Sequence, residues 1–373
     1  MQVLKSKQVE DSIKQVKVKD INEKNISNEK TKKTEGDNSS NSTKEQIPTL
    51  YEIEEKMKSI KMFECFELKN YIDSGSESNV FKIQHKKTKK EYALKIIKQH
   101  KKKSSNLKEL QIASTLKHPK IIDLNGYFFP KKKDDDNSQY IIMENGKYGN
   151  LRNFLLNVLK IKKCLSEAMI CFFAYQILEG LNYCHRCKIA HMDIKPQNIV
   201  VDDYLNAKLI DFSISINYKN KNPNEKIMLP FKGTSFYMSP EVYNSDEIQY
   251  KDLNKVDLYA LGVVLFNLAF GSYPYNLKNG DEDHEEIIKE KLKSKLEIKN
   301  ERHFSSYFID FISKLLESDI NKRMSLNEAI HHPWIQGAKF LFEEKENMNN
   351  LSSFVTKLLT GTIIKFNEYT KNR

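Results

Sequence analysis

The feature that most constrains this chain is a polar run, HMDIKPQN, at residues 191–198. Within six positions, Asp193, Lys195 and Asn198 provide an acceptor for a proton, a positive charge and a ligand for a metal ion. Transfer of a phosphoryl group requires these kinds of chemistry. Farther along, an apolar stretch ends at Asp211, a carboxylate suited to Mg²⁺. Each piece alone is a weak signal, but their order and spacing together are specific.

Strand-like stretches come before helical ones along the chain. A helical pattern covers residues 106–116, and after Gly149 the periodicity is chiefly helical through Trp334, with short strands near residues 189–212. This order predicts an α+β fold with two lobes. The strand-like stretches, separated by turn or polar residues, are residues 66–73, 79–86, 91–98, 121–129 and 139–144.

The two ends of the chain differ from its middle in composition. Residues 1–48 are rich in Lys, Asn, Glu and Ser, so they cannot bury enough surface to offset the entropy of ordering, and we expect a disordered tail. Apolar residues return at spacings of three and four over residues 49–65, which predicts a short helix or linker. Residues 336–373 form a mixed apolar and charged C-terminal tail.

The net charge of +11 raises the question of a nucleic-acid partner. The lysines lie among acidic residues, without a basic stripe that alternates with aromatic residues, so we expect a solvated surface and no nucleic acid. No run of about 18 apolar residues is present, so we expect no membrane span. The first residues have no apolar segment typical of a secretory signal, which favours a cytoplasmic location, with the nucleus as the alternative.

The polar run and Asp211, together with Lys95 on a strand-like stretch, resemble the motifs of the eukaryotic protein kinase family, serine/threonine type. The resemblance covers residues 66–335. It implies a bilobal kinase fold with a β-rich N-lobe over residues 66–146 and a mainly helical C-lobe over residues 147–335. The block NKRMSLNEAIHHPWI, which closes this range, is similar to the calmodulin-dependent-kinase-like branch.

The resemblance implies a role for each residue of the catalytic set, with protein hydroxyls as substrates. Asp193 would be the catalytic base, and Asn198 and Asp211 would be the magnesium ligands. Lys195 would contact the transferring phosphate, as in serine/threonine rather than tyrosine kinases. Thr234 would join Lys195 to the base.

The resemblance also implies an ATP site. Lys95 would hold the α- and β-phosphates with Glu109 as its ion-pair partner, and Gly75 is the glycine that remains in the phosphate loop. The apolar residues predicted around the adenine can also be ordinary core residues, and both interpretations can hold together. The gatekeeper is Met143, the hinge runs from Glu144 to Gly146, and the ring would lie between Val80, Ala93 and Val200.

The glycines depart from the family pattern. The loop at residues 73–80 keeps only Gly75 where the family has three glycines, and Ser213 replaces the glycine that usually follows the phenylalanine. Because glycine lets a backbone approach phosphates closely, we expect weaker ATP binding rather than its loss. The alternatives are a pseudokinase scaffold that binds nucleotide weakly, or a signalling hub whose tails recruit partners.

The usual activation switch is also missing. Met192 stands where regulated kinases carry an arginine that pairs with a phosphate on the activation segment. Between Ser215 and Thr234 the only hydroxyl belongs to Tyr218, and Phe231 occupies the position of the usual phosphothreonine. We therefore predict a kinase that does not need activation-loop phosphorylation.

Two anchoring interactions follow from the same resemblance. Glu241 should pair with Arg323. Asp257 should hold the backbone of the catalytic loop, which is the polar run at residues 191–198. Residues 352–366 faintly resemble a calmodulin-target helix, through which a regulatory protein could bind. Gly361 interrupts that helix, so packing of the segment on the C-lobe is the favoured interpretation.

Overall fold

The computed structural model describes residues 64–74, 78–97, 103–128, 138–161, 165–229, 232–244, 246–275, 298–300, 302–348 and 350–371. The predicted tail, nearly all of the predicted helix before residue 66, and Gly75 lie outside these ranges. The chain divides into two compact units, one with Met1–Gln99 and Gly126–Met143, the other with His100–Asn125 and Glu144–Arg373.

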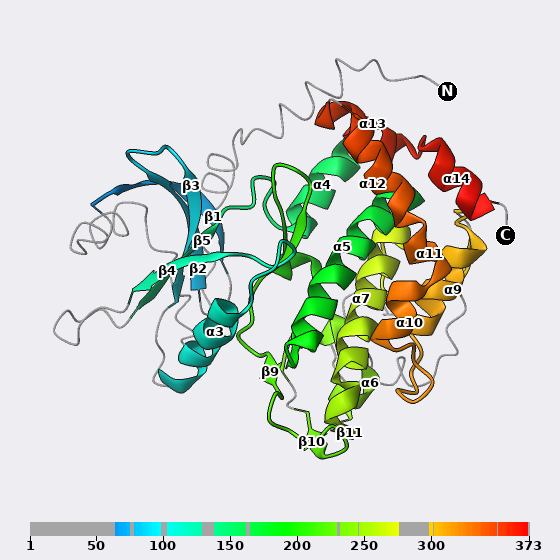
Figure 1. The fold of residues 1–373 in the computed structure, drawn as a ribbon, viewed down its shortest axis with the longest axis horizontal. Coiled ribbons are helices and arrows are strands. Elements are labelled where there is room, and N and C mark those ends of the chain that lie inside the picture. The colour runs from blue at the N-terminus through cyan, green and yellow to red at the C-terminus, as the bar shows by residue number, and fades with distance from the viewer. Residues whose placement is uncertain are drawn as a thin grey trace, which may run out of the picture. The chain divides into compact units, whose positions relative to one another are not determined.

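The first unit is built on a five-stranded sheet in the order β1-β2-β3-β5-β4 (Figure 1). One face of its central strands is a core in which Phe81, Ile83, Leu94 and Tyr140 are almost fully buried. All predicted strands are present, which confirms the α+β class. The strands are β1 (Phe66–Ser74), β2 (Ser78–His85), β3 (Glu91–Ile97), β4 (Leu124–Phe128) and β5 (Gln139–Glu144).

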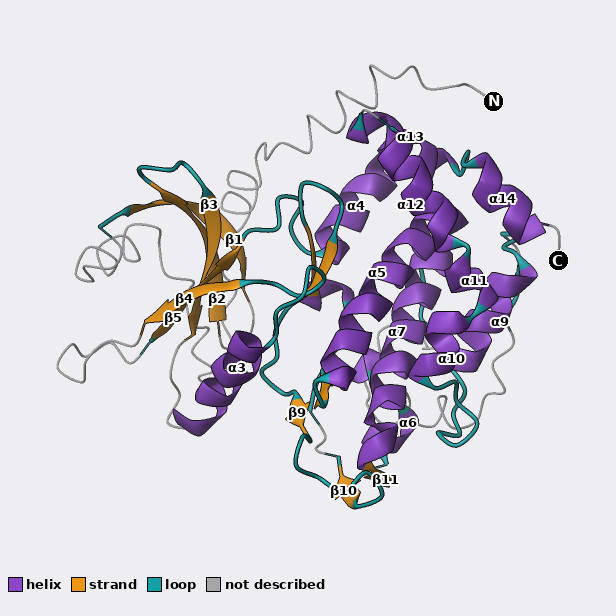
Figure 2. Ribbon diagram, in the orientation of Figure 1, coloured by secondary structure: helices purple, strands orange, loops and turns teal. Residues whose placement is uncertain are grey.

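The second unit is mainly helical, and α5 and α7 pack against each other within it (Figure 2). The stretch Tyr250–Phe270 is long and apolar enough to cross a membrane by length and composition, but 72% of its most apolar window is buried, as in a core helix. The helices are α3 (Lys103–Thr115), α4 (Leu151–Ile161), α5 (Glu167–Arg186), α6 (Pro240–Tyr243), α7 (Leu253–Phe270), α9 (Ser306–Leu315), α10 (Leu326–His331), α11 (Pro333–Gln336), α12 (Ala338–Asn347), α13 (Leu351–Thr360) and α14 (Ile364–Lys371).

Short antiparallel strand pairs position the loops of the second unit. These pairs flank the catalytic loop and hold parts of the activation segment. The pairs are β6 (Ile189–Ala190) with β9 (Ile216–Asn217), β7 (Ile199–Val201) with β8 (Ala207–Leu209), and β10 (Lys226–Met228) with β11 (Glu247–Gln249).

The C-terminal helices α12 and α13 pack on α5. The Phe354 ring lies 5.4 Å from the ring of Phe172 on α5, and Phe354, Leu358 and Ile363 are buried. Helix α13 ends at Gly361, whose φ of +65° is the left-handed conformation in which glycine has no steric penalty. The apolar face that resembled a calmodulin target is thus used internally, which confirms the packing interpretation.

Candidate active site

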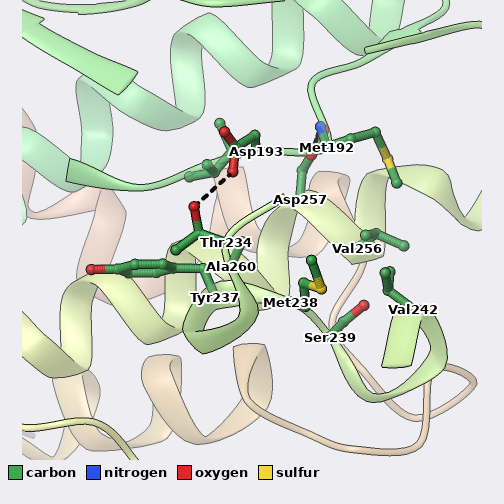
Figure 3. A pocket seen from close by; sticks show the side chains of 11 residues that line it. Met192, Asp193, Thr234, Tyr237, Met238, Ser239, Val242, Val256, Asp257 and Ala260 are labelled. Carbon is green, nitrogen blue, oxygen red and sulfur yellow. Dashed lines mark hydrogen bonds between the residues drawn. The ribbon is translucent and has the colours of Figure 1, made fainter. Parts of the chain in front are cut away.

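The catalytic loop brings four predicted catalytic residues together around one carboxylate. Lys195 Nζ lies 2.7 Å from Asp193 Oδ2 and donates a hydrogen bond of 2.7 Å to Thr234 Oγ1. Asn198 Nδ2 donates to Asp193 Oδ2 at 2.8 Å. The Thr234 hydroxyl donates to Asp193 Oδ1 at 3.4 Å, as the dashed line in Figure 3 shows. The Asp193 side chain keeps 12% exposure, so a substrate hydroxyl can reach it.

The β7–β8 hairpin places the second predicted metal ligand beside this group. The Ile210 N–H donates to the Asn198 carbonyl at 3.0 Å, so Asp211 follows at the same end of the hairpin. Because the Asn198 amide nitrogen is used toward Asp193, its oxygen is the atom that can face a cation. An amide oxygen and a carboxylate are hard ligands that fit Mg²⁺.

Two residues of the site have left-handed backbone conformations, with φ of 70° at Met192 and 66° at Asp211. Such conformations are costly for residues with a Cβ and persist only where surrounding contacts impose them. At Met192 the contact is visible, because its N–H donates to Asp257 Oδ1 at 2.8 Å. Strain at these positions agrees with a functional loop.

Asp257 anchors the catalytic loop from the buried helix α7, as predicted. Its Oδ2 accepts hydrogen bonds from the His191 N–H at 2.9 Å, and lies 2.7 Å from His185 Nε2. Burial opposes the charged form of Asp257, but the hydrogen bonds and attraction of His185 and His191 outweigh it and hold its pKa below the usual value. The carboxylate therefore stays ionised and continues to accept hydrogen bonds from the loop backbone.

In the first unit, three predicted ATP-site residues share one face of the sheet. Val80 on β2 lies opposite Lys95 on β3, and Ala93 lies opposite Lys82. Residues directly opposite each other in antiparallel strands point to the same face. It is the opposite face of the sheet from the one whose side chains, such as Phe81 and Leu94, pack in the core. Met143, the predicted gatekeeper, is half-buried at the end of this unit.

In the second unit, predicted hinge and adenine residues lie close together. A Cβ added to Gly146 would meet the Val200 Cβ at 2.9 Å, so glycine is required for this approach. Glu144 Oε1 lies 2.5 Å from Lys208 Nζ on β8. Glu109 is buried on α3, in a different unit from Lys95, and their pairing stays a prediction.

The predicted pair of Glu241 and Arg323 is confirmed. The guanidinium binds the carboxylate in two places, Nη1 to Oε1 at 2.7 Å and Nη2 to Oε2 at 2.9 Å. Both side chains are buried, and Arg323 also lies 4.8 Å from the centre of the Tyr259 ring. This contact ties the end of the activation segment to the loop before α10.

A hydrogen-bond chain behind the catalytic loop was not predicted from the sequence. The Tyr218 hydroxyl lies 3.1 Å from His185 Nδ1, and His185 in turn binds Asp257. These residues come from three distant segments, and no local spacing marks them as partners. Lys208, which pairs with Glu144, was missed for the same reason.

Comparisons with known proteins agree with this geometry. Residues 66–335 match the family model of the protein kinase domain. The chain is 31% identical over 295 residues to Aurora kinase of Saccharomyces cerevisiae, covering 78% of this chain and 74% of the relative. It is 29% identical over 317 residues to Death-associated protein kinase 2 of Mus musculus, covering 80% of each chain. It is 27% identical over 271 residues to Testis-specific serine/threonine-protein kinase 1 of Mus musculus, covering 71% of this chain and 70% of that one. Since the relatives carry different kinase names, the finer resemblance to one branch stays a prediction.

Proposed function

The chain belongs to the eukaryotic protein kinase family as a serine/threonine kinase, and we propose that it phosphorylates its protein substrates without needing a phosphate on its own activation segment. The proposal has two parts. The chemistry of phosphoryl transfer is retained, and apolar packing replaces the usual phosphate-dependent switch.

The retained chemistry rests on the arrangement around Asp193. Its carboxylate accepts the proton of the substrate serine or threonine hydroxyl, while Lys195 and Thr234 hold the carboxylate in position. Asn198 and Asp211 would hold Mg²⁺. Protein kinases generally use ATP and Mg²⁺, which supply the transferred phosphate and neutralise its charge when bound.

The observation that carries the second part is the environment of Met192. Its side chain points toward Val242 and Val256 and lies in one apolar pocket with Met238 (Figure 3). The space left in this pocket is about 10 Å³, at the lower limit for one water molecule. Met192 thus makes apolar contacts at the position where regulated kinases carry the arginine that binds a phosphate.

Other parts of the activation segment are also held by contacts that involve no phosphate. Its strand β10 pairs with β11, where Ile227 lies opposite the buried Ile248. Leu229, which follows β10, is 2% exposed in the same apolar cluster. Tyr218, the only hydroxyl between Ser215 and Thr234, is engaged with His185. A segment with these contacts does not need a phosphate to be ordered.

We expect that Ile227→Asp lowers kcat/KM about tenfold or more, because a carboxylate placed against the apolar cluster costs more than the about 1–3 kcal/mol of a neutral polar group. Steady-state kinetics on a generic protein substrate give the rate, and limited proteolysis reports cleavage within residues 216–229. Met228→Asp is the matched control, since Met228 is 65% exposed on the same strand. Equal losses in both variants would contradict the packing role of Ile227.

A further inference from the structure

Away from the catalytic residues, four lysines surround one hollow of about 220 Å³ in the second unit. We call it the lysine pocket, and its floor carries His185 and Tyr218. No acidic side chain is found among the described residues that line it. The lysines come from the turn before β6, the activation segment and the short helical turn before α7: Lys188, Lys219, Lys221 and Lys251.

Backbone hydrogen bonds fix the walls of the lysine pocket. The Tyr218 N–H donates to the Lys188 carbonyl at 2.9 Å, which joins the activation segment to the turn before β6. The Lys251 N–H donates to the Pro223 carbonyl at 3.0 Å, which joins the middle of the segment to the helical turn before α7. The lysine backbones are therefore held near one another before any ligand arrives, and preorganisation lowers the cost of binding.

The positive charges of the lysine pocket are poorly compensated. Lys221 Nζ lies 3.7 Å from Glu225, but both side chains are about half exposed, and such surface pairs contribute little. Among the described residues, Lys251 Nζ donates to a neutral amide, Asn224 Oδ1, at 3.2 Å. The side chains of Lys188 and Lys219 form no ion pair with any described residue. An anion between these lysines would relieve their mutual repulsion.

The neutral groups that line the pocket leave room for an anion. Burial raises the pKa of the Tyr218 hydroxyl, so it stays protonated and does not add a negative charge. A water molecule occupies about 30 Å³ of liquid volume, so the hollow can hold a phosphate group with part of its hydration shell. Lysine ammonium groups bind phosphate as point charges from several directions, which fits their spread around the rim.

We propose that the lysine pocket is a binding site for a phosphate group. A phosphate bound there bridges Lys219 and Lys221 of the activation segment to Lys188 and Lys251 on the elements beside it. The phosphate does not come from the stretch between Ser215 and Thr234, because the only hydroxyl there belongs to Tyr218, which itself lines the pocket. Binding at this pocket does not require phosphoryl transfer by the chain.

The test measures binding of a phosphoserine peptide to the full chain by calorimetry, with saturating Mg·ADP so that nucleotide sites are filled. We expect the double variant Lys219→Gln, Lys251→Gln to raise the Kd about tenfold or more, since it removes two of the charge-assisted hydrogen bonds to the phosphate. The matched control is Lys117→Gln, Lys365→Gln, whose lysines are 62% and 67% exposed in surface ion pairs. It should bind like the wild type.

Two further titrations identify the source of the phosphate. The first titration uses inorganic phosphate. If its binding depends on Lys219 and Lys251 and is at least as tight as that of the peptide, the pocket recognises the free anion. If the phosphoserine peptide binds more tightly, the pocket recognises a protein-borne phosphate. Both results support the site. It is overturned if the pocket variant binds like the wild type, if the control variant loses as much affinity, or if the unphosphorylated peptide binds equally well.

Discussion

Asp193→Asn is expected to lower kcat about 10²- to 10⁴-fold, the usual contribution of a positioned general base. Asparagine keeps the size of the side chain and can still contact Lys195 and Asn198, so the fold should be unchanged. It cannot accept the proton of a substrate hydroxyl. Label transfer from Mg·ATP to generic protein substrates gives kcat, and thermal unfolding checks the fold.

Asp203→Asn is the control, because Asp203 is an exposed acid on the turn after β7. It should transfer phosphate at the wild-type rate. Equal background label from the wild type and from Asp193→Asn would contradict the catalytic role of Asp193. That outcome is the one expected of a pseudokinase scaffold, the alternative suggested by the loop that keeps only Gly75.

Arg323→Met is expected to lower the free energy of unfolding by about 3–5 kcal/mol. The reason is that the Glu241 carboxylate would keep its buried position and lose both guanidinium hydrogen bonds. The methionine side chain fills part of the volume of the arginine that it replaces. The loss of stability therefore comes mainly from the missing charge partner of Glu241 and less from a cavity. Urea unfolding followed by tryptophan fluorescence measures the change, because Trp334 is buried in the same unit.

Lys322→Met is the matched control for this variant. Lys322 is the neighbouring residue, 75% exposed, and its pair with Asp319 lies at the surface. Such a pair contributes about 0–1 kcal/mol. The double variant Glu241→Gln, Arg323→Met should lose less stability than Arg323→Met alone, since no unpaired charge is left. A destabilisation of Arg323→Met no larger than that of the control would contradict the account of this pair.

The catalytic set was predictable from the sequence because its chemistry is local. Asp193, Lys195 and Asn198 lie within one short loop, and the β7–β8 hairpin brings Asp211 back to it. The anchors Asp257 and Arg323 lie far along the chain, and they were found through resemblance rather than spacing. The strands of the sheet were also predictable, because each is long enough to show its pattern.

What was missed depends on contacts between distant short segments. Strands β10 and β11 have three residues each, too few to give a periodic signal. The lysine pocket draws on three separate regions of the chain, and in the sequence its lysines cannot be told from solvated surface. The packing of the partly buried Met192 against apolar residues likewise depends on where α6 and α7 lie. Lys95 and Glu109 belong to different units, and their pairing stays a prediction.

We propose that this kinase keeps the chemistry of phosphoryl transfer and holds its activation segment by apolar packing. The most direct test is the initial rate of phosphate transfer by protein that mass spectrometry shows to be free of phosphate between Phe212 and Glu241. We predict the same initial rate as for protein that has not been treated with phosphatase. A rate that is lost when a phosphate is removed from this segment, and restored when it is put back, would contradict the claim.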